Sequence, residues 1–468
     1  MDKETFRRVG HELVDWVAEY LDTVDARPVV PRIDPGDILS RLADHAPETP
    51  ESMNRIMDDF KHVIMPGISH WQHPGWFGYF PANSSPPSIL AELLIAGVGA
   101  QCMIWQTSPA AAELETVVLD WLRKMLGLPE NMTGVIQDGA SAATLCALLT
   151  AREVATGFKS NLTGITMPLT VYTSVESHSS VEKGAKIAGF GKDHIRLIPT
   201  DPEFAMDPVE LERAIVRDRK AGMTPACVVA TIGTTSSTAV DPIDRIGRIC
   251  RQYNVRLHVD AAYAGTAAVV PELRHFFKGL EYAHSFVFNP HKWMLTNFDC
   301  SAYFVTEPDL LTRTFEIHPE YLKTGLESQV TNYRDWGIPL GRRFRALKLW
   351  FVIRSYGVAG IRRMVTEHVH FANTFKRWVA DHPSFELMAP VHFSLVCFRF
   401  NDGRPESTLN EFNEALLENI NEPGDVFLTH TVLGGKYTLR MAIGTWKTEE
   451  THVRQAWERI VNCAEASA

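Results

Sequence analysis

The chain has 468 residues, of which 45% are hydrophobic, 22% charged and 10% aromatic. This is more than one simple core accommodates, so we expect two or three packed units of an ordinary globular protein. The formal net charge of −10 disfavours nucleic acid or an anionic membrane as a partner. No stretch reaches the roughly 20 apolar residues of a membrane span.

The seven cysteines are dispersed along the chain and include no CxxC pair. This pattern argues against a disulfide framework and against a structural zinc site. The N-terminus alternates charged and apolar residues, unlike a secretory signal. We therefore expect a reduced, cytoplasmic protein without a metal site.

Residues 1–85 are predicted to form a separate helical segment. Apolar residues recur there at helical spacing and form one stripe, made of Phe6, Val9, Leu13, Val17, Tyr20 and Leu21. A stripe on a terminal arm needs a partner. Either a second subunit or the rest of the chain would satisfy it, so a role in dimerisation is one of two open interpretations.

Residues 86–347 alternate short apolar runs with helical segments, which predicts a large domain with a mostly parallel sheet and helices on both faces. One helix has a clear start signal, with Asp207 as N-cap and Pro208 at the first helical position. Seven runs are predicted to be strands: 134–139, 169–175, 194–200, 226–233, 256–263, 285–290 and 301–306. In residues 348–468 the regular alternation of strand and helix stops, and the pattern of strands and helices predicts a small α+β domain.

Ligands bind beyond the carboxyl ends of the strands in such sheets, so the residues that follow each strand are the candidates for chemistry. Ala140 and Ser141 open a helix whose free N–H groups suit a phosphate. His178 follows the second strand, and Thr235 follows the fourth. Taken singly, each of these also fits an ordinary cap, a structural histidine or a polar loop.

Two further strand ends carry opposite charges. Asp260 ends an apolar strand, where a carboxylate is costly unless it pairs with a cation. A protonated pyridine nitrogen or an unseen basic side chain would serve equally. Lys292 lies in the turn Asn289–Pro290–His291–Lys292 and is suited to imine chemistry if desolvation lowers its pKa. Together, these strand ends supply the parts of a pyridoxal-phosphate (PLP) site.

The motifs HVDAAYAG and NPHKW, about thirty residues apart, are accompanied by PGWFGYFPANSS, HSSVEKGAKIAG and IPLGRRFRALKLWFV. With them the sequence resembles the group II PLP-dependent decarboxylases, and within these the aromatic-L-amino-acid decarboxylases. The resemblance extends over nearly the whole chain. It implies an aspartate-aminotransferase-like PLP fold and a homodimer whose N-terminal helical segment clasps the other subunit.

The resemblance also implies a role for each site residue. Lys292 would bind PLP covalently, Asp260 would contact the pyridine nitrogen, and His178 would stack on the ring opposite Ala262. Tyr321, in the family's catalytic loop, would return a proton to the carbon that loses CO2; this loop is about two residues shorter than in animal members. The residues implied to hold the phosphate or lie beside the ring are Ala140, Ser141, Asn289, His291 and Thr235.

The substrate pocket implied by the resemblance has an aromatic wall, formed by Trp71, Tyr79, Phe80 and Pro81. These residues would also suit core packing. Three positions depart from the family pattern: Ala82 replaces a hydroxyl residue, and Gln101 and Met103 replace apolar and aromatic residues contributed across the dimer. Gly341 leaves room for a large ring, which favours L-tryptophan, followed by L-DOPA, L-tyrosine and L-phenylalanine. An apolar wall disfavours small acidic substrates.

Three rival functions remain. An aldehyde synthase of the same family would decarboxylate and then oxidatively deaminate, but such enzymes usually carry Phe at the loop tyrosine or Asn at the stacking histidine, whereas this chain has Tyr321 and His178. A non-catalytic PLP-binding protein is disfavoured by the intact set of Lys292, Asp260, His178 and Tyr321. An aminotransferase would need a group to grip the substrate carboxylate, and the sequence identifies none.

Overall fold

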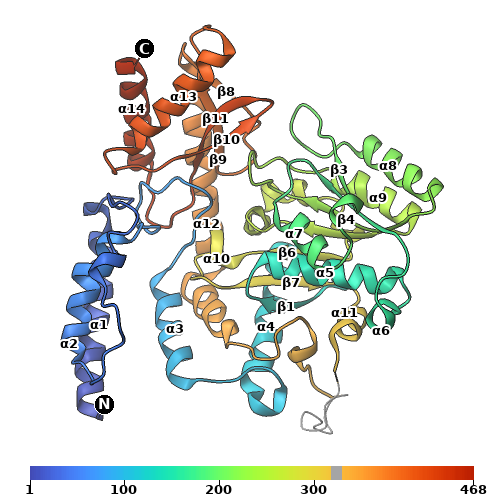
Figure 1. The fold of residues 1–468 in the computed structure, drawn as a ribbon, viewed down its shortest axis with the longest axis horizontal. Coiled ribbons are helices and arrows are strands. Elements are labelled where there is room, and N and C mark those ends of the chain that lie inside the picture. The colour runs from blue at the N-terminus through green and yellow to red at the C-terminus, as the bar shows by residue number, and fades with distance from the viewer. Residues whose placement is uncertain (318–328, 468) are drawn as a thin grey trace. The chain divides into compact units, whose positions relative to one another are not determined.

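The computed structural model describes residues 1–317 and 329–467 (Figure 1). Its helices are α1 (Lys3–Thr23), α2 (Met53–Asp59), α3 (Pro86–Val98), α4 (Pro109–Leu126), α5 (Ala140–Ala155), α6 (Ser160–Thr163), α7 (Ser180–Ile187), α8 (Pro208–Lys220), α9 (Ile243–Tyr253), α10 (Pro290–Trp293), α11 (Pro308–Phe315), α12 (Arg345–Asp381), α13 (Glu406–Asn421) and α14 (Glu450–Ser467). Its strands are β1 (Thr133–Gln137), β2 (Leu169–Ser174), β3 (Ile195–Ile198), β4 (Thr224–Thr231), β5 (Arg256–Asp260), β6 (Ser285–Phe288), β7 (Ser301–Val305), β8 (Phe385–Leu387), β9 (Leu395–Phe400), β10 (Thr429–Leu433) and β11 (Lys436–Ala442).

The chain divides into two compact units. The first contains Met1–Pro81, Trp378–Glu386 and Arg399–Ala468, and the second contains Ala82–Arg377 and Leu387–Phe398. The N-terminal segment is therefore grouped with the end of the chain. The division into 1–85, 86–347 and 348–468 drawn from the sequence follows other boundaries and stays a prediction.

The second unit contains a seven-stranded sheet with the order β1-β7-β6-β5-β4-β2-β3. Each strand overlaps one of the seven predicted runs. β2 pairs in parallel with β3 and β4, and β5 pairs in parallel with β4 and β6. β7 is antiparallel to both of its neighbours, β1 and β6. The predicted mostly parallel α/β sheet is confirmed, with β7 as its one reversed strand.

Helices cover this sheet on both faces. Successive residues of a strand point to opposite faces, and on β2 both are buried against helices. On β2, Val171 packs in a cluster with residues of α5 and α7. The next residue, Tyr172, donates its hydroxyl to Asp218 of α8 at 2.7 Å. At the start of α8, Asp207 accepts a hydrogen bond from the backbone N–H of Val209 at 2.8 Å, which confirms the predicted N-cap.

The direction of the strands brings the candidate residues to one edge of the sheet. β1, β2, β4, β5 and β6 all run the same way, so their carboxyl ends lie at a common edge. β7 runs in reverse and begins at this edge. The segments that carry the predicted PLP site therefore follow one another along the edge, as parallel-sheet geometry requires.

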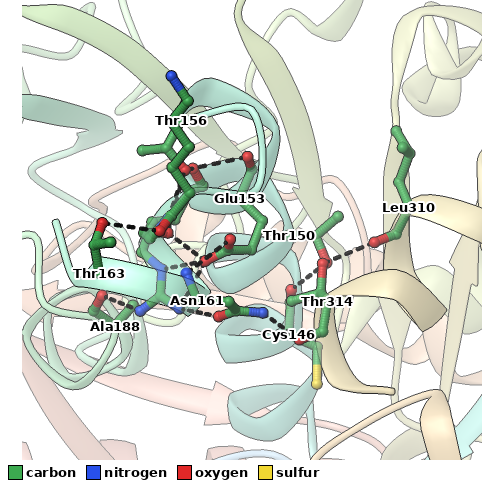
Figure 2. Close-up of polar contacts among 12 residues, drawn as sticks. Cys146, Thr150, Glu153, Thr156, Asn161, Thr163, Ala188, Leu310 and Thr314 are labelled. Atoms are coloured by element: carbon green, nitrogen blue, oxygen red, sulfur yellow. Dashed lines mark hydrogen bonds and ion pairs between the residues drawn. The ribbon is translucent and has the colours of Figure 1, made fainter. Parts of the chain in front are cut away.

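Helix α5 starts at this edge and is anchored at its other end by a buried polar network (Figure 2). Glu153 is fully buried and accepts hydrogen bonds from the Arg152 guanidinium at 2.9 Å and from the Ser160 hydroxyl. Asn161 donates its backbone N–H to Glu153 at 3.2 Å and its side chain to the carbonyl of Thr314 at 2.9 Å. The network thus joins α5, α6 and α11 and compensates the buried charge.

A smaller sheet has the order β10-β11-β9-β8. Its first two strands are antiparallel and joined by Gly434 and Gly435. Both glycines have positive φ, 58° and 81°, which a two-residue hairpin turn requires and L side chains resist. With α13 packed on β11, this confirms the predicted small α+β element. No helix in the described part of the chain is both long and apolar enough to cross a membrane.

Candidate active site

Lys292 lies on α10, directly after β6. The short helix is closed by a hydrogen bond from the Lys292 N–H to the carbonyl of Asn289 at 2.9 Å. The Lys292 carbonyl accepts a second bond from the Asn83 side chain at 2.8 Å. Burial lowers the pKa of Lys292, and the charge of Asp260 opposes the shift. A lysine with a lowered pKa is more often neutral and therefore nucleophilic.

Asp260 is the last residue of β5 and is 5% exposed. Its Oδ1 accepts a hydrogen bond from the N–H of Ala262 at 2.9 Å. β5 pairs with β6, and Asp260 is in register with Val287. The carboxylate is therefore fixed one strand away from the turn that carries Lys292, where it favours a positive charge.

His178 follows β2 and has a defined tautomer. Its Nδ1 accepts from the backbone N–H of Ser180 at 3.1 Å and lies 2.8 Å from the Ser180 hydroxyl, so the proton of the neutral ring is on Nε2. Loss of hydration lowers the pKa of His178; Asp260 opposes this, and Lys292 adds to it. Asp260 and Lys292 are therefore both within electrostatic range of His178.

The residues predicted to hold a phosphate offer hydrogen-bond donors at the same edge. Ala140 and Ser141 form the first turn of α5, where N–H groups have no partner within the helix. Asn289 accepts the Ser301 hydroxyl on Oδ1 at 2.5 Å, which leaves Nδ2 as its donor end. His291 accepts the N–H of Cys300 on Nδ1 at 2.8 Å, so its proton is on Nε2. These donors suit an anion.

Burial, reinforced by the charge of Lys292, lowers the pKa of His291 to about 3. The ring is therefore neutral near pH 7 and serves as a donor through Nε2 without adding charge. Ala262 is half-buried, and its carbonyl accepts the N–H of Asn289 at 2.9 Å, which couples the ends of β5 and β6. Thr235 is exposed in the loop after β4.

The predicted aromatic wall lies in the first unit. The rings of Trp71 and Trp76 are 4.3 Å apart, and those of Trp71 and Tyr79 stack at 5.8 Å. Tyr79 has a φ of 53° and is 55% exposed. Phe80 and Pro81 are buried, and the guanidinium of Arg440 lies 5.5 Å from the Phe80 ring. Phe80 and Pro81 are therefore placed for core packing, whereas Tyr79 exposes its ring; the substrate-binding role of these residues stays a prediction.

The remaining predicted substrate residues lie in the second unit. Gln101 and Gly341 are brought together: a Cβ added at Gly341 would lie 3.3 Å from the Gln101 amide nitrogen. Met103 is half-buried and accepts the N–H of Arg334 on its carbonyl at 2.9 Å. Ala82 is half-buried. Tyr321, with the loop 319–323, lies outside the described residues.

Sequence reasoning missed two structural supports of the site. Asn83, 1% exposed, holds the Lys292 carbonyl from more than 200 positions away. Arg342 forms a buried ion pair with Glu115 at 2.6 Å and so fixes the segment that contains Gly341. The only signal for either was its place in a motif, FPANSS for Asn83 and PLGRR for Arg342.

This set of groups fits PLP. The buried Asp260 carboxylate suits a protonated pyridine nitrogen, the Lys292 amine has the lowered pKa that imine formation needs, and the donors at α5, Asn289 and His291 suit the phosphate. Among the described residues, no group of three or more metal-ligating side chains is gathered, and all seven cysteines are buried free thiols.

Comparison with known proteins gives the family. Residues 35–401 match the model of the pyridoxal-dependent decarboxylase conserved domain. The chain is 43% identical to phenylacetaldehyde synthase of Arabidopsis thaliana over 471 residues, covering 98% of this chain and 96% of that protein. It is 44% identical to aromatic-L-amino-acid decarboxylase of Sus scrofa over 478 residues, with coverages of 98% and 96%.

Solved structures agree with this result. The crystal structure of Oryza sativa TDC with PLP and tryptamine superimposes with a TM-score of 0.97 at 36% identity, covering 100% of this chain and 99% of that chain. A family model spanning most of the chain, relatives above 40% identity and a near-identical fold all lead to one assignment. This chain belongs to the pyridoxal-dependent decarboxylases and is a PLP-dependent carboxy-lyase.

Proposed function

We propose that this enzyme removes the α-carboxylate of an aromatic L-amino acid as CO2 and releases the corresponding arylalkylamine. L-tryptophan is the first candidate substrate, followed by L-DOPA, L-tyrosine and L-phenylalanine. The observation that carries the proposal is the proximity of the Asp260 carboxylate to a lysine of lowered pKa at the carboxyl edge of the sheet. Aromatic-amino-acid decarboxylases among the relatives support it.

Different residues of the chain have different roles in the proposed decarboxylation. Bound PLP supplies a conjugated electron acceptor for the electron pair left when the bond between Cα and the carboxylate breaks. Asp260 keeps the pyridine nitrogen protonated, because a buried carboxylate favours a neighbouring cation. His178, neutral through its lowered pKa, offers a flat ring face that holds the cofactor plane. Tyr321 returns a proton to Cα.

Substrate choice follows from the aromatic wall and from Gly341. The stacked rings of Trp71 and Tyr79 suit an aromatic side chain, since ring pairs gain about 0.5–1.5 kcal/mol beyond area burial. Gly341 has no side chain to fill the space a fused ring needs. Gln101 and Met103 are further candidates for contact with the substrate. Ala82, which follows the wall in the sequence, offers no hydroxyl for hydrogen bonding.

Two alternatives are less well supported. An aldehyde synthase is the nearest, and a phenylacetaldehyde synthase is among the similar proteins. The presence of both Tyr321 and His178 favours simple decarboxylation instead. A non-catalytic PLP-binding protein would not need Lys292, Asp260 and His178 in mutual electrostatic range.

We also propose that the enzyme is a homodimer with shared active sites. Helix α3 exposes one apolar face made of Leu90, Leu93, Leu94 and Val98, which are 51%, 57%, 48% and 69% exposed. Residues at this spacing lie on one side of a helix, and a stripe of this kind is expected to be covered. The seven cysteines form no disulfide with one another in the described structure, and we propose a reducing compartment, the cytoplasm.

The function is tested with purified enzyme, PLP and a panel of the standard amino acids plus L-DOPA. We expect amine and CO2 in equal amounts from aromatic substrates only, with little ammonia or peroxide. Amine and CO2 are identified by mass spectrometry and gas release. Stoichiometric peroxide with aldehyde would instead establish the aldehyde synthase, and amine from glutamate would contradict the aromatic assignment.

Replacing Lys292 with Ala should abolish the visible absorption of bound PLP, because no other side chain supplies the amine at this turn. The fold should persist, as measured by circular dichroism. Lys186→Ala, an exposed lysine paired with Glu182, is the matched control and should keep the spectrum. An unchanged spectrum in Lys292→Ala would rule out the assigned covalent link.

Replacing Tyr321 with Phe should shift the product from amine towards aldehyde, because the proton donor to Cα is lost and the substrate carbon becomes open to oxidation by O2. The ratio of amine to aldehyde, with ammonia and peroxide, measures the shift. Tyr253→Phe, a surface tyrosine bonded to Glu212 at 2.9 Å, should leave the ratio unchanged. Constant amine output in Tyr321→Phe would remove this residue from the proton-donor role.

Replacing Leu94 with Glu should weaken the dimer, because an apolar side chain contributes about 1.5–3 kcal/mol when it is buried and a buried unpaired charge opposes association. Sedimentation equilibrium measures the dissociation constant, which should rise at least tenfold. Leu162→Glu is the control, since Leu162 on α6 is 83% exposed and lies outside the α3 face. A wild-type enzyme that is active as a monomer would refute the shared-site dimer.

A further inference from the structure

The Gln101 side chain is held in place by the segment that carries Gly341. Its Oε1 accepts the backbone N–H of Arg342 at 2.7 Å. The neighbouring Cys102 N–H donates to the carbonyl of Arg342 at 3.0 Å. Two hydrogen bonds thus clamp residues 101–102 to Arg342, and Arg342 is itself fixed by its buried ion pair with Glu115.

This clamp settles which way the Gln101 amide points. A backbone N–H is a donor only, so the atom that faces Arg342 must be the amide oxygen. The Nε2 group, with its two hydrogens, is then the opposite end. It lies against the bare backbone of Gly341, where an added Cβ would be 3.3 Å away. Among the described residues, Nε2 has no hydrogen-bond acceptor.

Gln101 and Gly341 line one hollow of about 320 Å³ in the second unit, together with Ile95, Ala96 and Phe344.

 The volume of this hollow, 320 Å³, is of the order of a small aromatic ring with its substituents. Both arginines that border it are already paired with carboxylates, Arg342 with Glu115 and Arg343 with Glu92 and Asp299. The Gln101 amide is therefore the uncommitted donor among the described side chains that line it.

We propose that Gln101 determines substrate specificity by donating a hydrogen bond from Nε2 to a hydroxyl group on the substrate ring. For rings of equal size, the enzyme then prefers the hydroxylated one: L-tyrosine over L-phenylalanine, and ring-hydroxylated L-tryptophan over L-tryptophan. This inference rests on the proposed function, since Gln101 and Gly341 are among the proposed substrate residues. It adds a preference for ring hydroxyl groups, which the small size of Gly341 does not specify.

The preference follows from donor and acceptor chemistry. A hydroxyl oxygen accepts a hydrogen bond, whereas a phenyl ring has no acceptor and an indole N–H is itself a donor. An unsubstituted ring would displace water from Nε2 and leave the amide without a partner, which costs more than an absent contact. A pocket that offers a polar partner discriminates against the analogue that lacks it more strongly than an apolar pocket does.

The test measures kcat/KM for amine formation by the PLP-loaded enzyme on the two matched substrate pairs. Gln101→Glu keeps an oxygen to accept the Arg342 N–H and replaces the Nε2 donor with an acceptor. Gln101→Met removes both. In each variant, the ratio of hydroxylated to unsubstituted substrate should fall about tenfold, the value of one hydrogen bond to an otherwise unpaired group.

Thr107→Val is the control, because it removes the bond from the Thr107 hydroxyl to the Gln101 carbonyl at 2.9 Å without changing the amide. It should keep the wild-type ratio. A ratio that stays unchanged in both Gln101 variants would overturn the assignment to Gln101 while leaving the decarboxylase intact. Absence of amine from all four substrates in the wild-type enzyme would overturn the proposed function itself.

Discussion

The charges of Asp260 and Lys292 constrain the whole site, because Asp260 ends the buried strand β5, Lys292 lies on the short helix that follows β6, and a buried charge is costly without a partner. β5 and β6 are adjacent, and the bonds from Ala262 N–H to Asp260 and from Asn289 N–H to the Ala262 carbonyl link their ends. Burial lowers the pKa of Lys292 and Asp260 opposes it. The protonation of the lysine is thus set by a fixed balance of two effects, which requires a rigid frame.

The reversed strand β7 extends this frame to the phosphate end. Because β7 begins where the parallel strands end, Cys300 and Ser301 lie beside the turn that carries Asn289 and His291. The Cys300 N–H donates to Nδ1 of His291 and the Ser301 hydroxyl donates to Oδ1 of Asn289, so the other polar atom of each acceptor side chain remains available. The single antiparallel strand therefore orients two donors that a purely parallel sheet would leave free to rotate.

The strand runs and the residues at their ends could be predicted from the sequence, since burial on both faces requires continuous apolar runs and parallel strands end at a common edge. The place of β7 between β1 and β6 could not, because periodicity carries no information on which distant strands pair. The same holds for Asn83, whose contact with Lys292 joins remote segments, and for the amide orientation of Gln101, which depends on Arg342.

The candidate catalytic residues and the candidate selectors of substrate therefore lie in different parts of the chain. The catalytic groups follow strands of the sheet, whereas the candidate selectors lie in irregular segments: Tyr79, at a φ of 53° that costs an aromatic residue about 1–3 kcal/mol, and the clamp between Gln101 and Arg342. Loops tolerate change more readily than buried strands. Relatives near 43% identity that are named as decarboxylases or as aldehyde synthases are consistent with one sheet-borne cofactor site surrounded by variable selectors.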